Sequence, residues 1–225
     1  PTRASLLSGY YPQQINRDAV LDVRGGGGGS PRPAWARLLP TYLKPVGYRS
    51  YHSGKWHIDG KPTGNGFDRS FYLADQGRFF SPKQLFKNDK KVKPKEGFYA
   101  TTAVADHAID VLKEHQAEHA ETPFFSFVAF TAPHFPLQAL PEDIARVGDR
   151  YKPGWEVIRR QRWERLQEMG LVKGELSQVE RSQGPPYDFS ERLKVLGDGE
   201  VTRPVPWDTL TEKQKKFQQD KMTIH

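Results

Sequence analysis

The stretch YRSYHSGKWH, residues 48–57, indicates the fold class of this chain. Its first six residues have the pattern of a short strand, which runs directly into a glycine and then into Lys55 and His57. A strand followed by a glycine and polar side chains is typical of the carboxyl edge of an open α/β sheet, where ligands bind. The stretch therefore predicts a sheet, with a site at the end of one of its strands.

Two elements further along the chain predict the same arrangement. Residues 99–120 have the clearest helical pattern, with an apolar stripe along one side. The apolar and aromatic run over residues 124–130 predicts a strand that is buried on both faces. It ends shortly before His134, and a helix followed by a core strand that delivers a histidine is typical of a βαβ arrangement. We therefore expect an α/β fold with an open central sheet flanked by helices.

The chain opens with PTRASLLSG, residues 1–9, which predicts a short helix with Pro1 at an early position and Gly9 at its end. The free N–H groups and the positive dipole end at a helix start attract anions. Arg3 adds a guanidinium that can bind an oxyanion through two hydrogen bonds. An ordinary capped helix with a surface arginine is the alternative interpretation.

The segments between these elements carry weaker signals. Residues 10–32 predict a loop, whose Gly25–Gly29 run is interpreted either as a flexible linker or as a mobile lip beside a site. Residues 34–47 predict a helix with a break at Pro40. Residues 61–97 predict loop and a hairpin, in which residues 79–86 pair with residues 90–93 across Asn88 and Asp89.

The last part of the chain has less regular patterning. Residues 155–169 predict an amphipathic helix, and residues 171–208 predict irregular, proline-containing chain. A capping box that begins at Thr211 predicts a final helix. We therefore expect residues 146–225 to form a loop-rich insertion and the start of a further helix.

Composition limits the class of protein. A chain of 225 residues can bury one good core, and its 18 prolines and 20 glycines predict long loops. The sequence holds no cysteine, which excludes disulfides and thiolate metal sites, and no apolar run approaches the roughly 20 residues that span a bilayer. The net charge is +7, but we find no zinc-finger spacing, RNA-binding signature or basic heptad helix, so nucleic acid is not an expected partner.

The lysines gather in two runs. The first comprises Lys83, Lys87, Lys90, Lys91, Lys93 and Lys95, and the second comprises Lys213, Lys215 and Lys216. Each run is interpreted either as a solvated surface or as a patch that binds a polyanion.

Four side chains at the ends of predicted elements are candidates for a shared site: Arg3, Lys55, His57 and His134. Two follow one predicted strand, one follows another strand, and Arg3 stands at a helix start, so all four can meet at one edge of a sheet. The alternate spacing of Lys55 and His57 places both side chains on one face if the backbone is extended. A surface lysine and hydrogen-bonded structural histidines are the alternative interpretations.

Four segments of the chain resemble signatures of the sulfatase family. Residues 1–9 are similar to the second half of Cys-x-Pro-Ser/Thr-Arg followed by Leu-x-x-Gly. Residues 48–57 are similar to the signature that closes in Gly-Lys-Trp-His, and residues 132–136 are similar to Pro-His-x-Pro. Gly-Phe-Asp at residues 66–68 also recurs in the family. The order and approximate spacing agree with the family, and the resemblance covers residues 1–145 best.

The resemblance implies a role for each candidate side chain. Arg3 would steady a hydrated formylglycine, the nucleophile, and Lys55 would contact both that nucleophile and the sulfate. His57 would hydrogen-bond the hydrate and help it to collapse to the aldehyde, while His134 would contact the sulfate and assist departure of the alcohol. Cations and N–H donors aimed at sulfate oxygens suit this chemistry, and a histidine that titrates near neutrality can move the protons.

The resemblance also implies groups that lie outside this sequence. Formylglycine, formed from Cys or Ser by a formylglycine-generating enzyme, would stand two positions before Pro1. A calcium ion, held by hard oxygen ligands, is implied for the full-length enzyme, with ligands before Pro1 and after His225, so no metal ligand is assigned here. We therefore expect residues 1–225 to form an incomplete alkaline-phosphatase-like catalytic domain, and we expect this piece alone to show no turnover.

Three functions remain open on the sequence. The first is an arylsulfatase-like sulfuric ester hydrolase that acts on a sulfated small molecule or a sulfated polysaccharide. The second is a phosphodiesterase or phosphonate hydrolase of the same superfamily, favoured if the residue two positions before Pro1 is Thr. The third is a non-catalytic relative that binds polyanions through the run from Lys83 to Lys95, for which a sulfated polysaccharide is the fitting partner. A periplasmic, secreted or lysosomal-type compartment is consistent with the family.

Overall fold

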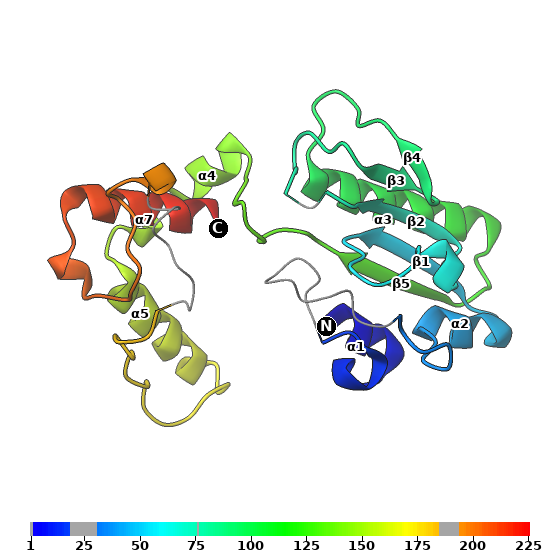
Figure 1. Ribbon diagram of the computed structural model, residues 1–225, viewed down its shortest axis with the longest axis horizontal. Coiled ribbons are helices and arrows are strands. Elements are labelled where there is room, and N and C mark those ends of the chain that lie inside the picture. Colours follow the sequence, from blue (N-terminus) through cyan, green and yellow to red (C-terminus); the bar gives the residue numbers. More distant parts are fainter. Residues whose placement is uncertain (1, 19–30, 76, 185–193) are drawn as a thin grey trace. The chain divides into compact units, whose positions relative to one another are not determined.

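A computed structural model describes residues 2–18, 31–75, 77–184 and 194–225 (Figure 1). Pro1 and the Gly25–Gly29 run lie outside these residues. The chain divides into two compact units, Pro1–Pro136 and Leu137–His225. The first unit contains all four candidate site residues.

A five-stranded sheet in the order β4-β3-β2-β1-β5 forms the centre of the first unit (Figure 1). The strands are β1 (Arg49–Gly54), β2 (Arg69–Leu73), β3 (Leu85–Lys87), β4 (Lys90–Val92) and β5 (Phe124–Ala129). β1 is parallel to β2 on one side and to β5 on the other. β3 pairs antiparallel with β2, and β4 pairs antiparallel with β3. The carboxyl ends of β1, β2 and β5 therefore lie at one edge of the sheet.

Helices cover both faces of this sheet. They are α1 (Thr2–Ser8), α2 (Leu39–Leu43) and α3 (Ala100–Glu118). Val104 of α3 packs with Phe71 in one buried cluster, and Leu7 of α1 packs with Tyr72 in another. Because successive side chains of a strand point to opposite faces, the two clusters lie on opposite sides of β2. The open α/β sheet expected from the sequence is confirmed.

Several boundaries in the first unit differ from the predictions. The strand over residues 48–53, the helix over residues 99–120 and the helix over residues 1–9 are confirmed as β1, α3 and α1. The interpretation of residues 69–73 as loop is wrong, since they form β2. The hairpin forms across Asn88 and Asp89, both at positive φ, but its first strand begins at Leu85 rather than at residue 79.

Two further predictions are corrected by packing. Residues 34–38 are not helical: α2 begins at Leu39, with Pro40 in the first turn, where no backbone N–H is needed. β5 is not buried on both faces, since Phe124 is 47% and Val128 40% exposed. The reason is position, because β5 ends the described sheet order and has only β1 beside it.

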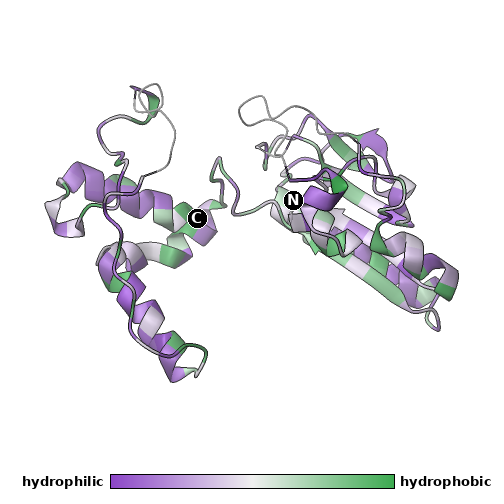
Figure 2. Ribbon diagram, turned by 60° about the horizontal axis from the view of Figure 1, so that its bottom comes forward, coloured by the Kyte–Doolittle hydropathy of each residue, from purple (hydrophilic) through white to green (hydrophobic). Residues whose placement is uncertain are grey.

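The second unit contains three described helices of five residues or more: α4 (Pro141–Val147), α5 (Trp155–Glu168) and α7 (Glu212–Ile224). The capping box is confirmed, because the Thr211 hydroxyl accepts a hydrogen bond from the Gln214 backbone N–H at 3.2 Å. The helix over residues 155–169 is also confirmed, but α5 buries none of its side chains fully. Figure 2 shows mostly hydrophilic colours along α5 and α7.

Shorter helical turns connect these elements. The described 3-10 turns are Pro12–Ile15, Lys44–Val46, Thr63–Asn65, Gly148–Tyr151 and Trp207–Thr209. No helix in the described parts of the chain is long and apolar enough to span a bilayer.

Candidate active site

Lys55 stands immediately after β1, at the carboxyl edge of the parallel strands. Its backbone N–H donates to the Ala129 carbonyl at 2.6 Å, and only 4% of the residue is exposed. Gly54 makes this close pairing possible: its φ is +110°, and a Cβ there would lie 2.1 Å from the Ala129 oxygen. The β1–β5 contact therefore fixes the backbone that carries Lys55.

The loop that follows Lys55 is held by a network that the sequence did not reveal. The indole N–H of Trp56 donates to the Gly60 carbonyl at 2.9 Å. The Asp59 carboxylate accepts from Nε of Arg17 at 2.8 Å and from Nε of Arg32 at 3.1 Å. Burial favours a raised pKa of Asp59, but the two arginine hydrogen bonds outweigh it and lower that pKa. A charged Asp59 therefore fastens this loop to segments on either side of residues 19–30.

His57 lies in this loop and is exposed. Its φ is +55°, in the left-handed region, so the backbone is not extended there. The sequence argument that alternate spacing puts Lys55 and His57 on one face of a strand is therefore wrong in its premise, because β1 ends at Gly54.

Arg3 lies in the first turn of α1 and is half-buried. Its Nη2 donates to the Phe130 carbonyl at 3.4 Å, just beyond the end of β5. Its Nε is buried and has no hydrogen-bond partner among the described residues. Leu7, one helical turn further, is anchored in the core. α1 thus places a guanidinium beside the carboxyl edge of the sheet.

His134 follows β5 in an exposed turn, in which its backbone N–H donates to the Thr131 carbonyl at 3.0 Å. Its ring stacks on Phe135, with centroids 4.6 Å apart. Nδ1 lies 2.6 Å from the Phe135 carbonyl. A carbonyl oxygen only accepts, so Nδ1 carries the proton in this contact and Nε2 is the nitrogen left for other partners.

Electrostatics link the four side chains. Burial, followed by the positive charge of Arg3, lowers the pKa of Lys55. Burial, followed by the charges of Lys55, Arg3 and His134, lowers the pKa of His57. None of the four forms an ion pair with a carboxylate in the parts of the chain that the structure describes. Lys55 and Arg3 thus bring positive charge without a counter-charge to this edge of the sheet, which an oxyanion would stabilise.

Two buried histidines lie behind this edge. His52 of β1 is fully buried among Trp56, Phe67 and Phe127, and burial lowers its pKa to about 3. His107 of α3 has Nδ1 2.7 Å from the Ser53 hydroxyl, and burial, followed by the charge of Lys87, lowers its pKa to about 4. Sequence analysis missed both. A polar residue in an otherwise buried strand is the signal that marks His52.

The described residues contain no group of three or more His, Cys, Asp or Glu side chains that could hold a metal ion. The cluster itself presents nitrogen cations and imidazoles, whereas calcium prefers carboxylate and carbonyl oxygens. This donor set does not fit a calcium ion, and no step of the chemistry below is routed through one.

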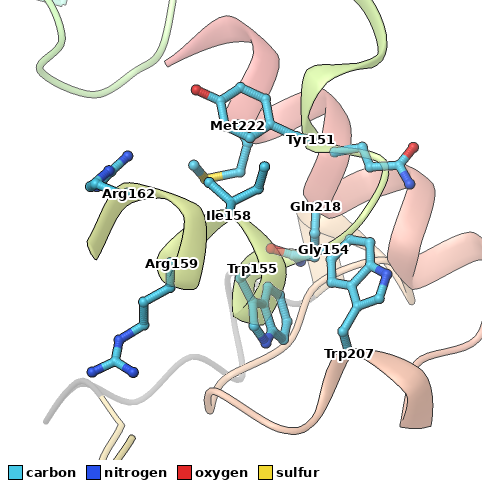
Figure 3. Close-up of a pocket in the computed structure, with 10 residues that line it drawn as sticks. Tyr151, Gly154, Trp155, Ile158, Arg159, Arg162, Trp207, Gln218 and Met222 are labelled. Carbon is cyan, nitrogen blue, oxygen red and sulfur yellow. The ribbon is translucent and has the colours of Figure 1, made fainter. Parts of the chain in front are cut away.

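A cavity of about 350 Å³ lies in the second unit (Figure 3). Trp155 and Trp207 meet edge to face on its wall, with centroids 4.9 Å apart. Two of its polar groups are already engaged: the Trp155 indole N–H donates to the Val205 carbonyl, and Gln218 Nε2 donates to the Gly199 carbonyl. None of the four candidate site residues lines this cavity.

Comparison with known proteins places the chain. The family model described as Sulfatase matches residues 1–182. The chain belongs to the sulfatase family. An uncharacterised sulfatase of Schizosaccharomyces pombe is 28% identical over 208 residues, which are 83% of this chain and 34% of the relative. An ulvan-active sulfatase of Formosa agariphila is 29% identical over 68% of this chain and 29% of its own length.

A solved structure supports the same assignment. The crystal structure of Ps i-CgsB in complex with k-i-k-neocarrahexaose has a TM-score of 0.54 and is 28% identical. The match covers 66% of this sulfatase chain and 38% of that chain. The chain spans about a third of the length of these three proteins.

Proposed function

We propose that the protein is an arylsulfatase-like sulfuric ester hydrolase that cleaves a sulfate monoester. The observation that carries this proposal is the position of two cations at the carboxyl edge of β1 and β5: Lys55 is buried there and Arg3 donates to the Phe130 carbonyl, and burial followed by the charge of Arg3 lowers the pKa of Lys55. A tetrahedral anion bound between them would remove that repulsion. Membership of the sulfatase family supports sulfate as the anion.

In this proposal each candidate side chain has its own role in the reaction. Lys55 and Arg3 bind sulfate oxygens and stabilise the charge that develops on them, for which one preorganised donor contributes about 3–4 kcal/mol by analogy with oxyanion holes. His134 presents Nε2 toward the ester oxygen and, when protonated, gives its proton to the departing alkoxide. A formylglycine two positions before Pro1 would supply the nucleophile for sulfur, and Arg3 and Lys55 would hold the sulfate beside it.

His57 is suited to the second half of the reaction. Its lowered pKa keeps the imidazole neutral near pH 7, so that it can accept a proton. If a formylglycine were present, His57 would act as the base that accepts a proton from it while sulfate is released. The exposed position of His57 lets that proton pass on to solvent.

The proposed substrate is a sulfated saccharide. One relative is named for activity on ulvan, and one similar structure was solved with k-i-k-neocarrahexaose. Both support a carbohydrate sulfate, while a sulfated small molecule remains the other candidate substrate. A phosphodiesterase or phosphonate hydrolase remains the alternative on the same cluster, and a Thr at the nucleophile position would favour it.

The proposal is tested by Lys55→Met in a full-length protein that carries the proposed nucleophile, with Lys61→Met as the matched control. Lys61 is exposed in the same loop. We expect Lys55→Met to lower kcat for a sulfate ester about 10²–10³-fold, as loss of one oxyanion donor does, and Lys61→Met to change it less than twofold. Equal activity of Lys55→Met and the parent would contradict the site.

A binding measurement separates the site from turnover. Sodium sulfate should raise the thermal stability of the 225-residue chain above sodium chloride of equal ionic strength. Sulfate at about tenfold above its Kd stabilises a folded site by about 1.4 kcal/mol. The shift should vanish in Lys55→Met and persist in Lys61→Met. A shift that is the same in both variants would place the anion elsewhere.

A further inference from the structure

The two lysine runs of the sequence differ in structure. In α7, Lys213 pairs with Asp198 at 3.0 Å and Lys215 pairs with Glu212 at 2.9 Å, while Lys216 pairs with Asp220. The first run lies on and around the β3–β4 hairpin; we call it the lysine hairpin and define it as Lys83, Lys87, Lys90, Lys91, Lys93 and Lys95. Its six side chains form no ion pair and no hydrogen bond with any described residue.

Two carboxylates close to the lysine hairpin are engaged elsewhere, while a third, Glu96 beside Lys95, is exposed and forms no ion pair with a described residue. Asp89, in the turn, bonds the hydroxyls of Thr63 and Ser70. Asp75 accepts hydrogen bonds from the backbone N–H groups of Lys83 and Gln84 at 2.6 and 3.1 Å. The positive charge of the hairpin is therefore not neutralised by its neighbours in the described structure, and all six lysines are exposed.

The strand register brings like charges together. Lys87 and Lys90 are direct partners across β3 and β4. Like charges directly opposite each other destabilise a strand pair, so this pairing does not serve the fold. Lys91 belongs to β4 and the chain continues through Lys93, Pro94 and Lys95. A residue before proline is held extended, and alternate residues of extended chain lie about 7 Å apart on one side.

Protection of a sheet edge explains only part of this pattern. β4 ends the described sheet order, and lysines on an edge strand discourage pairing with other chains. That accounts for Lys90 and Lys91. It does not account for Lys83, Lys93 and Lys95, which lie outside the strands.

We propose that the lysine hairpin is a binding surface for a sulfated polysaccharide, separate from the cluster around Lys55. The proposal rests on the proposed function for the choice of polyanion, since a chain that bears many sulfates is the substrate class of the site. Lys91, Lys93 and Lys95 stand at alternate positions of the chain, and such a series of cations fits a linear polymer with repeated anionic groups, whose contacts act through charge and counterion release.

The surface is tested by binding of the protein to heparin, with desulfated heparin as the paired ligand. The test variant carries Lys91→Gln, Lys93→Gln and Lys95→Gln. The control carries Lys213→Gln, Lys215→Gln and Lys216→Gln, so both variants remove three positive charges. We expect the Kd for heparin to rise at least tenfold in the test variant and less than twofold in the control. Circular dichroism melting verifies that both variants fold.

The salt dependence gives a second readout. Each released counterion contributes slightly less than one to the slope of log Kd against log salt, so the test variant should lower that slope by about 2–3. An equal loss of heparin affinity in both variants would overturn the proposal, because net charge alone would then explain the binding. The proposal would also be overturned if the parent protein bound desulfated heparin as tightly as heparin. The same holds if it bound duplex DNA as tightly as heparin.

These outcomes are independent of the proposed hydrolysis. The test variant should keep full activity on a small sulfate ester, since its three substitutions lie on and after β4, which β3 and β2 separate from β1 in the sheet. Lys55→Met should keep heparin affinity within twofold. Loss of heparin binding in Lys55→Met would mean that heparin binds at the Lys55 site, and it would overturn the proposal of a separate surface.

Discussion

The two units of this chain are held together in different ways. In Pro1–Pro136, both faces of one sheet are covered, and Phe79 and Val104 are almost completely buried. In Leu137–His225, α5 has no fully buried side chain, and the buried hydrophobic residues among those described are Trp207 and Leu210. The difference indicates that the sheet unit has an extended hydrophobic core, whereas the helical unit has a much smaller one.

The candidate site follows the same division. A site that must hold two repelling cations in place needs a rigid frame, because Lys55 and Arg3 would otherwise move apart into water. The frame is the β1–β5 pairing and the anchored helix α1. The following predictions compare the two units, from the largest expected effect to the smallest.

Phe79→Ala should destabilise the sheet unit by about 3–5 kcal/mol, because it empties the centre of the core on the α3 side. Val157→Ala, at a 41% exposed position of α5, should change stability by less than about 0.5 kcal/mol. Amide hydrogen exchange followed by mass spectrometry reports the free energy of opening for each unit. Similar effects of the two substitutions would refute the contrast in packing.

Gly54→Ala should destabilise the sheet unit by about 3 kcal/mol, since the new Cβ meets both an unfavourable φ and the Ala129 carbonyl. Gly170→Ala is the control in the helical unit: its φ is +70°, but nothing lies within 4 Å of an added Cβ. We expect about 1 kcal/mol there, from backbone strain alone. Urea unfolding monitored by circular dichroism measures both, and a fully stable Gly54→Ala protein would be inconsistent with the β1–β5 geometry.

Acid should loosen the sheet unit before the helical unit. The folded pKa of His52 is about 3, below its ordinary value of 6.5, so the unfolded chain binds the proton more readily. Its contribution to stability is therefore complete above about pH 6.5 and is lost as the pH falls toward the folded pKa, by up to about 1.4 kcal/mol per pH unit. His107, with a folded pKa of about 4, acts in the same direction.

His52→Phe checks this prediction. A phenyl ring can occupy the aromatic surroundings of His52 and binds no proton, so unfolding free energy should decline less steeply between pH 6 and pH 4. The helical unit has His225 as its only histidine and should lack this dependence. A variant with the same pH slope as the parent would show that His52 is not buried in the neutral form.

Thr211→Ala should cause a smaller loss than the substitutions in the sheet unit, about 1 kcal/mol confined to the helical unit. The substitution removes the hydroxyl that accepts from the Gln214 N–H at the start of α7. Thr211→Ser keeps that hydroxyl and should stay close to the parent. Hydrogen exchange in the first turn of α7 measures the change, and an equal loss in both variants would assign the effect to packing of the methyl group.

Local patterns were enough to predict the elements with strong signals. Strand β1, helix α3 and the cap of α7 follow from apolar runs, a helical stripe and a Thr-Glu-Lys-Gln start. β2 was missed because Arg69–Leu73 is short and lies within a loop-rich stretch, so its strand state depends on pairing with β1 and β3. The helix predicted before Pro40 does not form. A helix does begin at this point, since α2 starts at Leu39 and has Pro40 in its first turn.

The sequence by itself determined which side chains are candidates for the site. Arg3, Lys55, His57 and His134 stand in family signatures, and their residue types do not depend on the fold. The tertiary structure decided how they are charged. Burial lowers the pKa values of Arg3, Lys55 and His57, the charge of Arg3 adds to the shift of Lys55, and the charges of Lys55 and Arg3 add to that of His57; these effects arise only when distant parts of the chain are brought together. The same holds for the two lysine runs, which look alike in sequence and differ in structure because carboxylates reach only the second.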